Sequence, residues 1–124
     1  MSSERYEEGM AIRREVLGAD HVEQAMQATD KYVQPLQDLI NEFAWGSIWT
    51  REGLTTRTRS LLTIAMLVAL GREPELRRHI AGALRIGCTA DEVFEVLVHA
   101  IPFCGFPASL AAVRAFREVL AAKS

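Results

Sequence analysis

The sequence has 124 residues, of which 49% are hydrophobic, and its net charge at neutral pH is −2. This length indicates one domain over residues 1–124 with a core of ordinary size. The charged residues are mixed in sign, which excludes the basic stripe that a nucleic-acid surface needs. The start of the chain is polar and no apolar run is long enough to span a bilayer, so we expect a cytoplasmic protein without membrane partners.

The spacing of apolar residues is helical throughout, and no alternating stretch bounded by turns predicts a strand. We therefore expect an all-α fold, a single-domain helical bundle of about six helices. Asp20 is expected to cap a short helix, Pro35 to begin another, and Thr89 to form a capping box with Glu92. The expected helices cover residues 3–17, 20–28, 35–43, 55–70, 74–86, 89–101 and 107–121. Residues 44–49, which hold both tryptophans, are expected to form a loop.

The segment from Leu61 to Leu70 is apolar on every side of its helix. A helix with this pattern is usually buried all round. In a chain of this size, part of that burial would have to come from another subunit. We therefore expect an oligomer.

His79 shares a helical stripe with Leu76, Ile80 and Leu84, so it is expected to face the interior rather than solvent. One interpretation is a hydrogen-bonded core histidine. The other is a partly desolvated acid–base group. The spacing alone leaves both interpretations open.

His99 follows Glu95 by four residues, which places the two side chains on one helix face. They could form an ordinary surface pair, or the carboxylate could orient the imidazole for chemistry. Arg57 and Arg59 lie beside the expected N-terminus of a helix, where free N–H groups and guanidinium groups together favour an anion site. Solvated arginines beside an ordinary cap are the alternative.

The two cysteines, Cys88 and Cys104, do not have the spacing of a metal site, and nothing around them favours a thiolate. They are more simply small buried hydrophobic residues. Trp45 and Trp49 are expected to anchor a core or an interface, or to wall a small-molecule pocket.

Several stretches resemble the γ-carboxymuconolactone decarboxylase family of the alkylhydroperoxidase-D-like superfamily, in order and over nearly the whole chain. The most specific are the tryptophan segment and the arginine segment. The stretches are Arg14-Glu-Val-Leu-Gly18, Phe43-Ala-Trp-Gly46 with Trp49, Gly53-Leu-x-x-Arg57-Thr-Arg-Ser-Leu-Leu62, Ala69-Leu-Gly-Arg-Glu73 and Gly105-x-Pro-Ala108. The resemblance implies an all-helical homohexamer, a trimer of dimers. It also implies a decarboxylase without cofactor or metal, acting on 4-carboxymuconolactone in the protocatechuate branch of the β-ketoadipate pathway.

For the residues, the resemblance implies His79 as the leading proton donor and His99, oriented by Glu95, as a second donor or oxyanion partner. Arg57 and Arg59 would bind carboxylate, and Trp45 and Trp49 would wall the site. The Cys-x-x-Cys of the peroxidase relatives is replaced here by Arg72 and Glu75, so that thiol chemistry is not expected. Leu110 stands where the family pattern has Asn, which leaves open a related lactone substrate or a non-decarboxylating paralogue. A thiol peroxidase using Cys88 and Cys104, and a non-catalytic helical oligomer, are the alternative functions.

Overall fold

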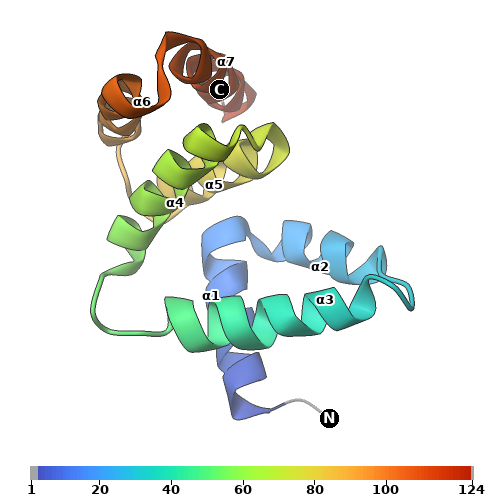
Figure 1. The fold of residues 1–124 in the computed structure, drawn as a ribbon. Coiled ribbons are helices and arrows are strands. Elements are labelled where there is room, and N and C mark those ends of the chain that lie inside the picture. Colours follow the sequence, from blue (N-terminus) through green and yellow to red (C-terminus); the bar gives the residue numbers. More distant parts are fainter. Residues whose placement is uncertain (1–2, 124) are drawn as a thin grey trace. The chain divides into compact units, whose positions relative to one another are not determined.

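The computed structural model describes residues 3–123, and this range is helical without a strand. The all-α fold class is therefore confirmed. Eight helical segments are present in this range, one more than the seven ranges placed along the sequence, and two of them join without a break. Contacts divide the chain after Thr56 into two compact units, described separately below (Figure 1). One domain over residues 1–124 stays a prediction. No helix in the described range is long and apolar enough to cross a membrane.

The first unit contains α1 (Glu4–Leu17), α2 (Ala19–Gln27), α3 (Gln34–Leu39) and the π-helix η1 (Ile40–Trp49). The Ser3 hydroxyl caps α1 by accepting the Tyr6 N–H, and Gly18 ends the helix at a φ of 92°, as expected from the sequence. Asp20 does not cap α2, because Gly18 is already the cap and Asp20 falls inside the first turn. There the carboxylate still faces the positive end of the helix dipole.

The tryptophan segment is helical, so the predicted loop over residues 44–49 is wrong. Here α3 continues directly into η1, which crosses α1 (Figure 1). The two helices meet at glycines: a Cβ on Gly9 would collide with the backbone of Asn41 and Gly46, and a Cβ on Gly46 would collide with the backbone of Arg5. Gly46 therefore permits close packing of two helices and does not break one.

A buried polar network also joins α1 to the α3–η1 helix. Arg13, which is 5% exposed, donates from Nη1 to Asn41 Oδ1 at 2.7 Å and to Gln37 Oε1 at 2.9 Å. Asn41 is fully buried and donates in turn to Tyr6 Oη at 3.2 Å. Hydrogen bonds from a charged donor are stronger than neutral ones, so this network fixes how the helices of the first unit pack.

The second unit contains α4 (Thr56–Leu70), α5 (Glu73–Arg85), α6 (Ala90–Cys104) and α7 (Phe106–Lys123). Gly71, Gly87 and Gly105 separate these helices, and all three have positive φ. The capping box of α6 is present, with Thr89 Oγ1 accepting the Glu92 N–H and Glu92 accepting the Thr89 N–H. These boundaries follow the sequence prediction closely, except that α6 continues through Pro102 to Cys104 instead of ending near Ile101.

The core of the second unit is almost entirely apolar and draws on all four helices. Its largest fully buried side chains are Ile64, Ile80, Val93 and Leu97. One stripe of α4, formed by Ser60, Ile64 and Val68, is buried, whereas Met66 and Leu70 are 62% and 68% exposed. The described chain therefore buries one face of α4, and burial of the other faces by a second subunit stays a prediction.

Candidate active site

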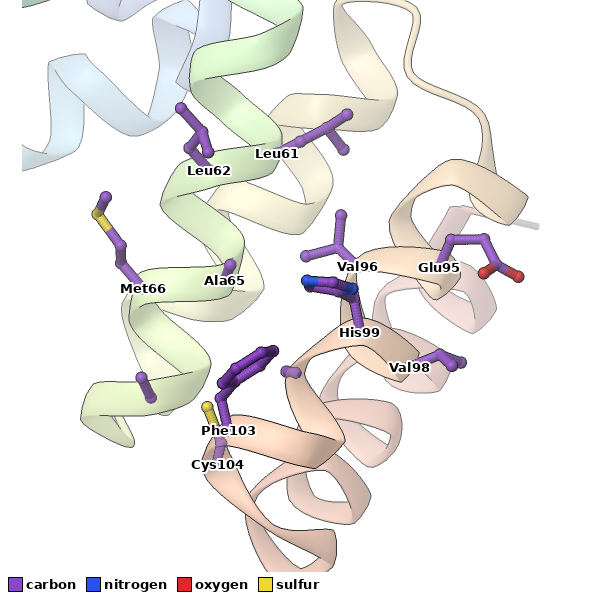
Figure 2. A pocket seen from close by; sticks show the side chains of 12 residues that line it. Leu61, Leu62, Ala65, Met66, Glu95, Val96, Val98, His99, Phe103 and Cys104 are labelled. Atoms are coloured by element: carbon purple, nitrogen blue, oxygen red, sulfur yellow. The ribbon is translucent and has the colours of Figure 1, made fainter.

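A groove of about 690 Å³ lies between α4 and α6 in the second unit (Figure 2). Its walls are mainly aliphatic and aromatic. The groups with acid–base or nucleophilic character in its lining are the side chains of His99, Glu95 and Cys104. The apolar lining is formed by Leu61, Leu62, Ala65, Met66, Ala69, Val96, Val98, Ala100 and Phe103. Such a concave, mostly apolar surface with few polar groups is typical of a small-molecule site.

Helical periodicity explains how the two walls arise. Leu61, Ala65 and Ala69 follow one another at intervals of four along α4, so they form one stripe. On α6, Val96, His99 and Phe103 form a second stripe at intervals of three and four. The small side chains of Ala65 and Ala69 leave open space beside α4, and larger side chains of α6 line the other side of that space.

His99 is exposed and lies in the groove, with its ring 5.7 Å from that of Phe103 at an angle of 42°. Within residues 3–123, the side chain of Glu95 makes no hydrogen bond or ion pair with His99, and it points away from the imidazole (Figure 2). The structure therefore does not bring Glu95 and His99 together, and the orienting role of Glu95 stays a prediction. Because α6 continues past Pro102, Phe103 falls four residues after His99 on the same face and contacts the imidazole instead.

His79 lies on α5, half-buried, between the buried side chains of Leu76 and Ile80. The expected position on the apolar stripe is thus confirmed, and its Nδ1 is shielded from solvent. His79 is not part of the groove lining. Of the two candidate histidines, His99 lines the groove and His79 lies on the apolar stripe of α5.

The guanidinium of Arg57 already binds groups of the second unit. Its Nη2 forms an ion pair with Glu92 Oε1 at 2.7 Å and also donates to the Gly87 carbonyl at 3.3 Å. The backbone N–H of Thr89 lowers the pKa of the Glu92 carboxyl, and Arg57 lowers it further. Arg59, two residues along α4, is half-buried.

Both cysteines belong to the second unit, and both are free thiols. Cys88 is buried, its Sγ is 3.9 Å from the Arg57 carbonyl, and burial raises the pKa of its thiol. A raised pKa disfavours the thiolate that a peroxidatic cysteine needs. Cys104 is half-buried in the groove wall.

Trp45 and Trp49 belong to the first unit and stack on each other, with ring centroids 4.5 Å apart and planes at 29°. Residues four apart lie on one face of a helix, which allows this stacking. Trp45 is buried and Trp49 is half-buried. Leu110, the position that departs from the family pattern, is 56% exposed on α7.

Two contributors to this region were not identified as site residues from the sequence. Glu92 was recognised only as a capping residue, although it lies seven residues before His99 and so shares its helix face. Phe103 lies beyond the helix that the sequence predicts over residues 89–101. The seven-residue spacing was the available signal for Glu92, and no comparable signal existed for Phe103.

Comparisons with known proteins agree with one another. Residues 34–118 match the model of the carboxymuconolactone decarboxylase family. The chain is 45% identical over 116 residues to 4-carboxymuconolactone decarboxylase of Acinetobacter baylyi, covering 94% of this chain and 87% of that protein. It is 38% identical over 108 residues to nitrosuccinic acid decarboxylase npaB of Metarhizium robertsii, covering 87% and 76%. An uncharacterized 15.0 kDa protein of Paracoccus denitrificans is 35% identical over 98 residues, covering 77% and 73%.

Proposed function

The chain belongs to the carboxymuconolactone decarboxylase family, and we propose that it converts 4-carboxymuconolactone, or a closely related lactone acid, to 4-oxoadipate enol-lactone and CO₂. The observation that carries this proposal is the 45% identity, over 94% of the chain, to a 4-carboxymuconolactone decarboxylase. The reaction would serve the protocatechuate branch of the β-ketoadipate pathway.

The chemistry of this substrate defines what the protein must supply. As CO₂ leaves the γ carbon, its bonding electrons move through the ring double bond to the lactone carbonyl. The substrate therefore accepts its own electrons, and the protein is left with three tasks. It must hold the carboxylates, stabilise charge on the lactone oxygen, and protonate the α carbon.

For the proton transfer we propose His79 as the leading donor and His99 as a second donor or oxyanion partner. His79 is half-buried between Leu76 and Ile80, which supports the first role. A shielded imidazole is less prone to exchange its proton with water instead of passing it to the substrate. The position of His99 in the groove supports the second. Glu95 lines the groove but does not contact His99, so its orienting role stays a prediction.

For substrate binding we propose Arg59 as the carboxylate ligand. Arg59 lies near the N-terminus of α4, where backbone N–H groups and the helix dipole also favour an anion. The role of Trp45 and Trp49 as apolar walls stays a prediction, and within the first unit the two stacked indoles form a rigid aromatic surface.

We also propose that the protein self-associates, as a hexamer built from three dimers. The support is the exposed apolar side of α4, which includes Leu62, Met66 and Leu70. Monomeric proteins rarely expose a continuous apolar strip of this kind. Light scattering at micromolar concentration is expected to report a multimer, and a Met66→Asp change is expected to lower the mass. A monomeric mass for the unaltered chain would contradict the proposal.

Nitrosuccinic acid is a second candidate substrate, favoured by the 38% identity to a nitrosuccinic acid decarboxylase. In both substrates the bonding electrons of the departing carboxylate can move into an electron-withdrawing group, directly into the nitro group or through the ring double bond into the lactone carbonyl. Comparing kcat/KM for the two acids distinguishes them. We expect the lactone to be preferred by at least tenfold, and a reversed preference would reassign the substrate.

Variants of the histidines test the proposed roles. We expect His79→Ala to lower kcat by about 10²–10⁴-fold, the usual contribution of general acid–base catalysis, and His99→Ala to have a smaller effect. His21→Ala, a change in α2 of the first unit, is the matched control and should retain full turnover. If His79→Ala turns over normally while His99→Ala does not, the leading donor is His99.

A further inference from the structure

The ion pair between Arg57 and Glu92 joins the two helices that form the walls of the groove. Arg57 lies in the first turn of α4 and Glu92 in the first turn of α6, and their side chains meet at 2.7 Å. Each partner is also held by backbone. Arg57 donates to the Gly87 carbonyl at 3.3 Å, and Glu92 accepts the Thr89 N–H at 2.8 Å.

The pair stands on the same two stripes as the groove lining. On α4, Arg57 lies four residues before Leu61 and eight before Ala65. On α6, Glu92 lies four residues before Val96 and seven before His99, a separation of about 10 Å along the helix. The ion pair therefore links the two helices one turn before the first lining residue of each stripe.

We propose that Arg57 and Glu92 are a positioning pair that sets the separation of α4 from α6 and thereby places His99 against the substrate. This inference rests on the proposed function. It assigns Arg57 a role different from direct binding of a substrate carboxylate, because its guanidinium already has a carboxylate partner and a backbone acceptor.

Because the ion pair is exposed, a role in positioning can be distinguished experimentally from a role in folding stability. The two side chains are 49% and 41% exposed, and exposed ion pairs contribute little to folding stability. A displacement of about 1 Å at a reacting group can nevertheless cost about 10²-fold in rate. Loss of the pair is therefore expected to change turnover much more than it changes unfolding.

The test is a double-mutant cycle of Arg57→Ala and Glu92→Ala, measured with 4-carboxymuconolactone. We expect each single variant to lower kcat by about tenfold or more, with KM changed less than about threefold, and the double variant to be no worse than either. Arg57→Lys, which keeps the charge, is expected to retain most of kcat.

Two controls accompany the cycle. Arg77→Ala breaks another exposed ion pair of the same unit, to Glu118 at 2.7 Å between α5 and α7, and should leave kcat within about twofold. Thr89→Ala removes the side-chain cap of α6 but keeps the backbone N–H that Glu92 accepts, so it should also leave kcat nearly unchanged.

A rise in KM for Arg57→Ala with kcat unchanged, additive with Glu92→Ala, would overturn the proposal and assign Arg57 to carboxylate binding. Unchanged kinetics in both single variants would overturn it as well. If the unaltered protein does not decarboxylate the lactone, the proposed function fails, and the alkylation rate of Cys104 in a Cys88→Ala background decides the inference. Faster labelling after Arg57→Ala supports a groove held by the pair, and an unchanged rate contradicts it.

Discussion

The interior of the first unit, residues 3–56, contains a charged side chain and two glycines at a close helix crossing. The interior of the second unit, residues 57–123, is almost entirely apolar. In the first unit, Arg13, Asn41, Gly9 and Gly46 determine how α1 meets the α3–η1 helix. In the second, apolar side chains such as Ile80 at helical spacing do so. The helical spacing of apolar residues therefore predicts packing well where the core is apolar. It predicts packing poorly where close contact between backbones or a buried polar network determines how the helices meet.

The largest effect is expected from removing core volume in the second unit. Ile80 is fully buried, so Ile80→Ala should lower the free energy of unfolding by about 2–5 kcal/mol, through lost burial and the cavity left behind. Ile80→Val, the matched control, should cost about 0.5–1.5 kcal/mol. Urea denaturation followed by circular dichroism measures both. Equal small losses would show that this core is loosely packed.

The next effect concerns the polar network of the first unit. Asn41→Ala removes an acceptor of the buried Arg13 guanidinium and should cost about 1.5–3 kcal/mol, the range for hydrogen bonds to charged groups. Gln34→Ala, which removes only an exposed hydrogen bond to Asp38, is the control and should cost less than about 0.5 kcal/mol. A neutral result for Asn41→Ala would mean that the network does not hold α1 to η1.

Glycine contacts give a third test of the same comparison. Helix propensity alone would make Gly9→Ala stabilising by about 1 kcal/mol, yet the added Cβ meets backbone of η1. We therefore expect a net loss of about 1–3 kcal/mol and faster amide exchange in η1. Gly53→Ala is the matched control because a Cβ there meets nothing within 4 Å. Stabilisation by Gly9→Ala would contradict the observed helix crossing.

The smallest effect is electrostatic. The pKa of Glu92 is lowered in the folded chain, so its contribution to stability is present above the usual glutamate pKa and is lost as pH falls through the lower folded value. A carbon-detected NMR titration of this carboxyl should show a midpoint below the usual glutamate range. Arg57→Gln should raise the midpoint only in part, because the Thr89 N–H is the larger cause. A midpoint unmoved by that change would mean that the ion pair is not formed in solution.

The sequence predicted most of the second unit because its signals are local. Three positive-φ glycines and the Thr89 capping box define the helix ends, and the apolar stripe places His79 beside the core. The sequence prediction ends α6 too early because a proline usually breaks a helix. Near a helix C-terminus a proline removes only one hydrogen bond, and α6 continues through Pro102 to Cys104.

The first unit and the candidate site were harder to predict because they depend on contacts between distant residues. Gly46 has the local signature of a turn, but in the structure it lies within η1, where its missing side chain permits close contact with α1. Arg57 was recognised as a functional residue, but its partner Glu92 is 35 residues away and appears only in the folded structure. Glu95 and His99 share one helix face but are not in contact, because shared placement on a helix face does not fix where a side chain points (Figure 2).

The most direct test of the proposed function is an ultraviolet assay of the purified protein with freshly prepared 4-carboxymuconolactone, combined with measurement of released CO₂. We predict loss of the lactone absorbance with one CO₂ released per substrate consumed and with 4-oxoadipate enol-lactone as product. No acceleration over the spontaneous reaction, with a correctly folded and assembled protein, would contradict the assignment of this chain as a decarboxylase of that lactone.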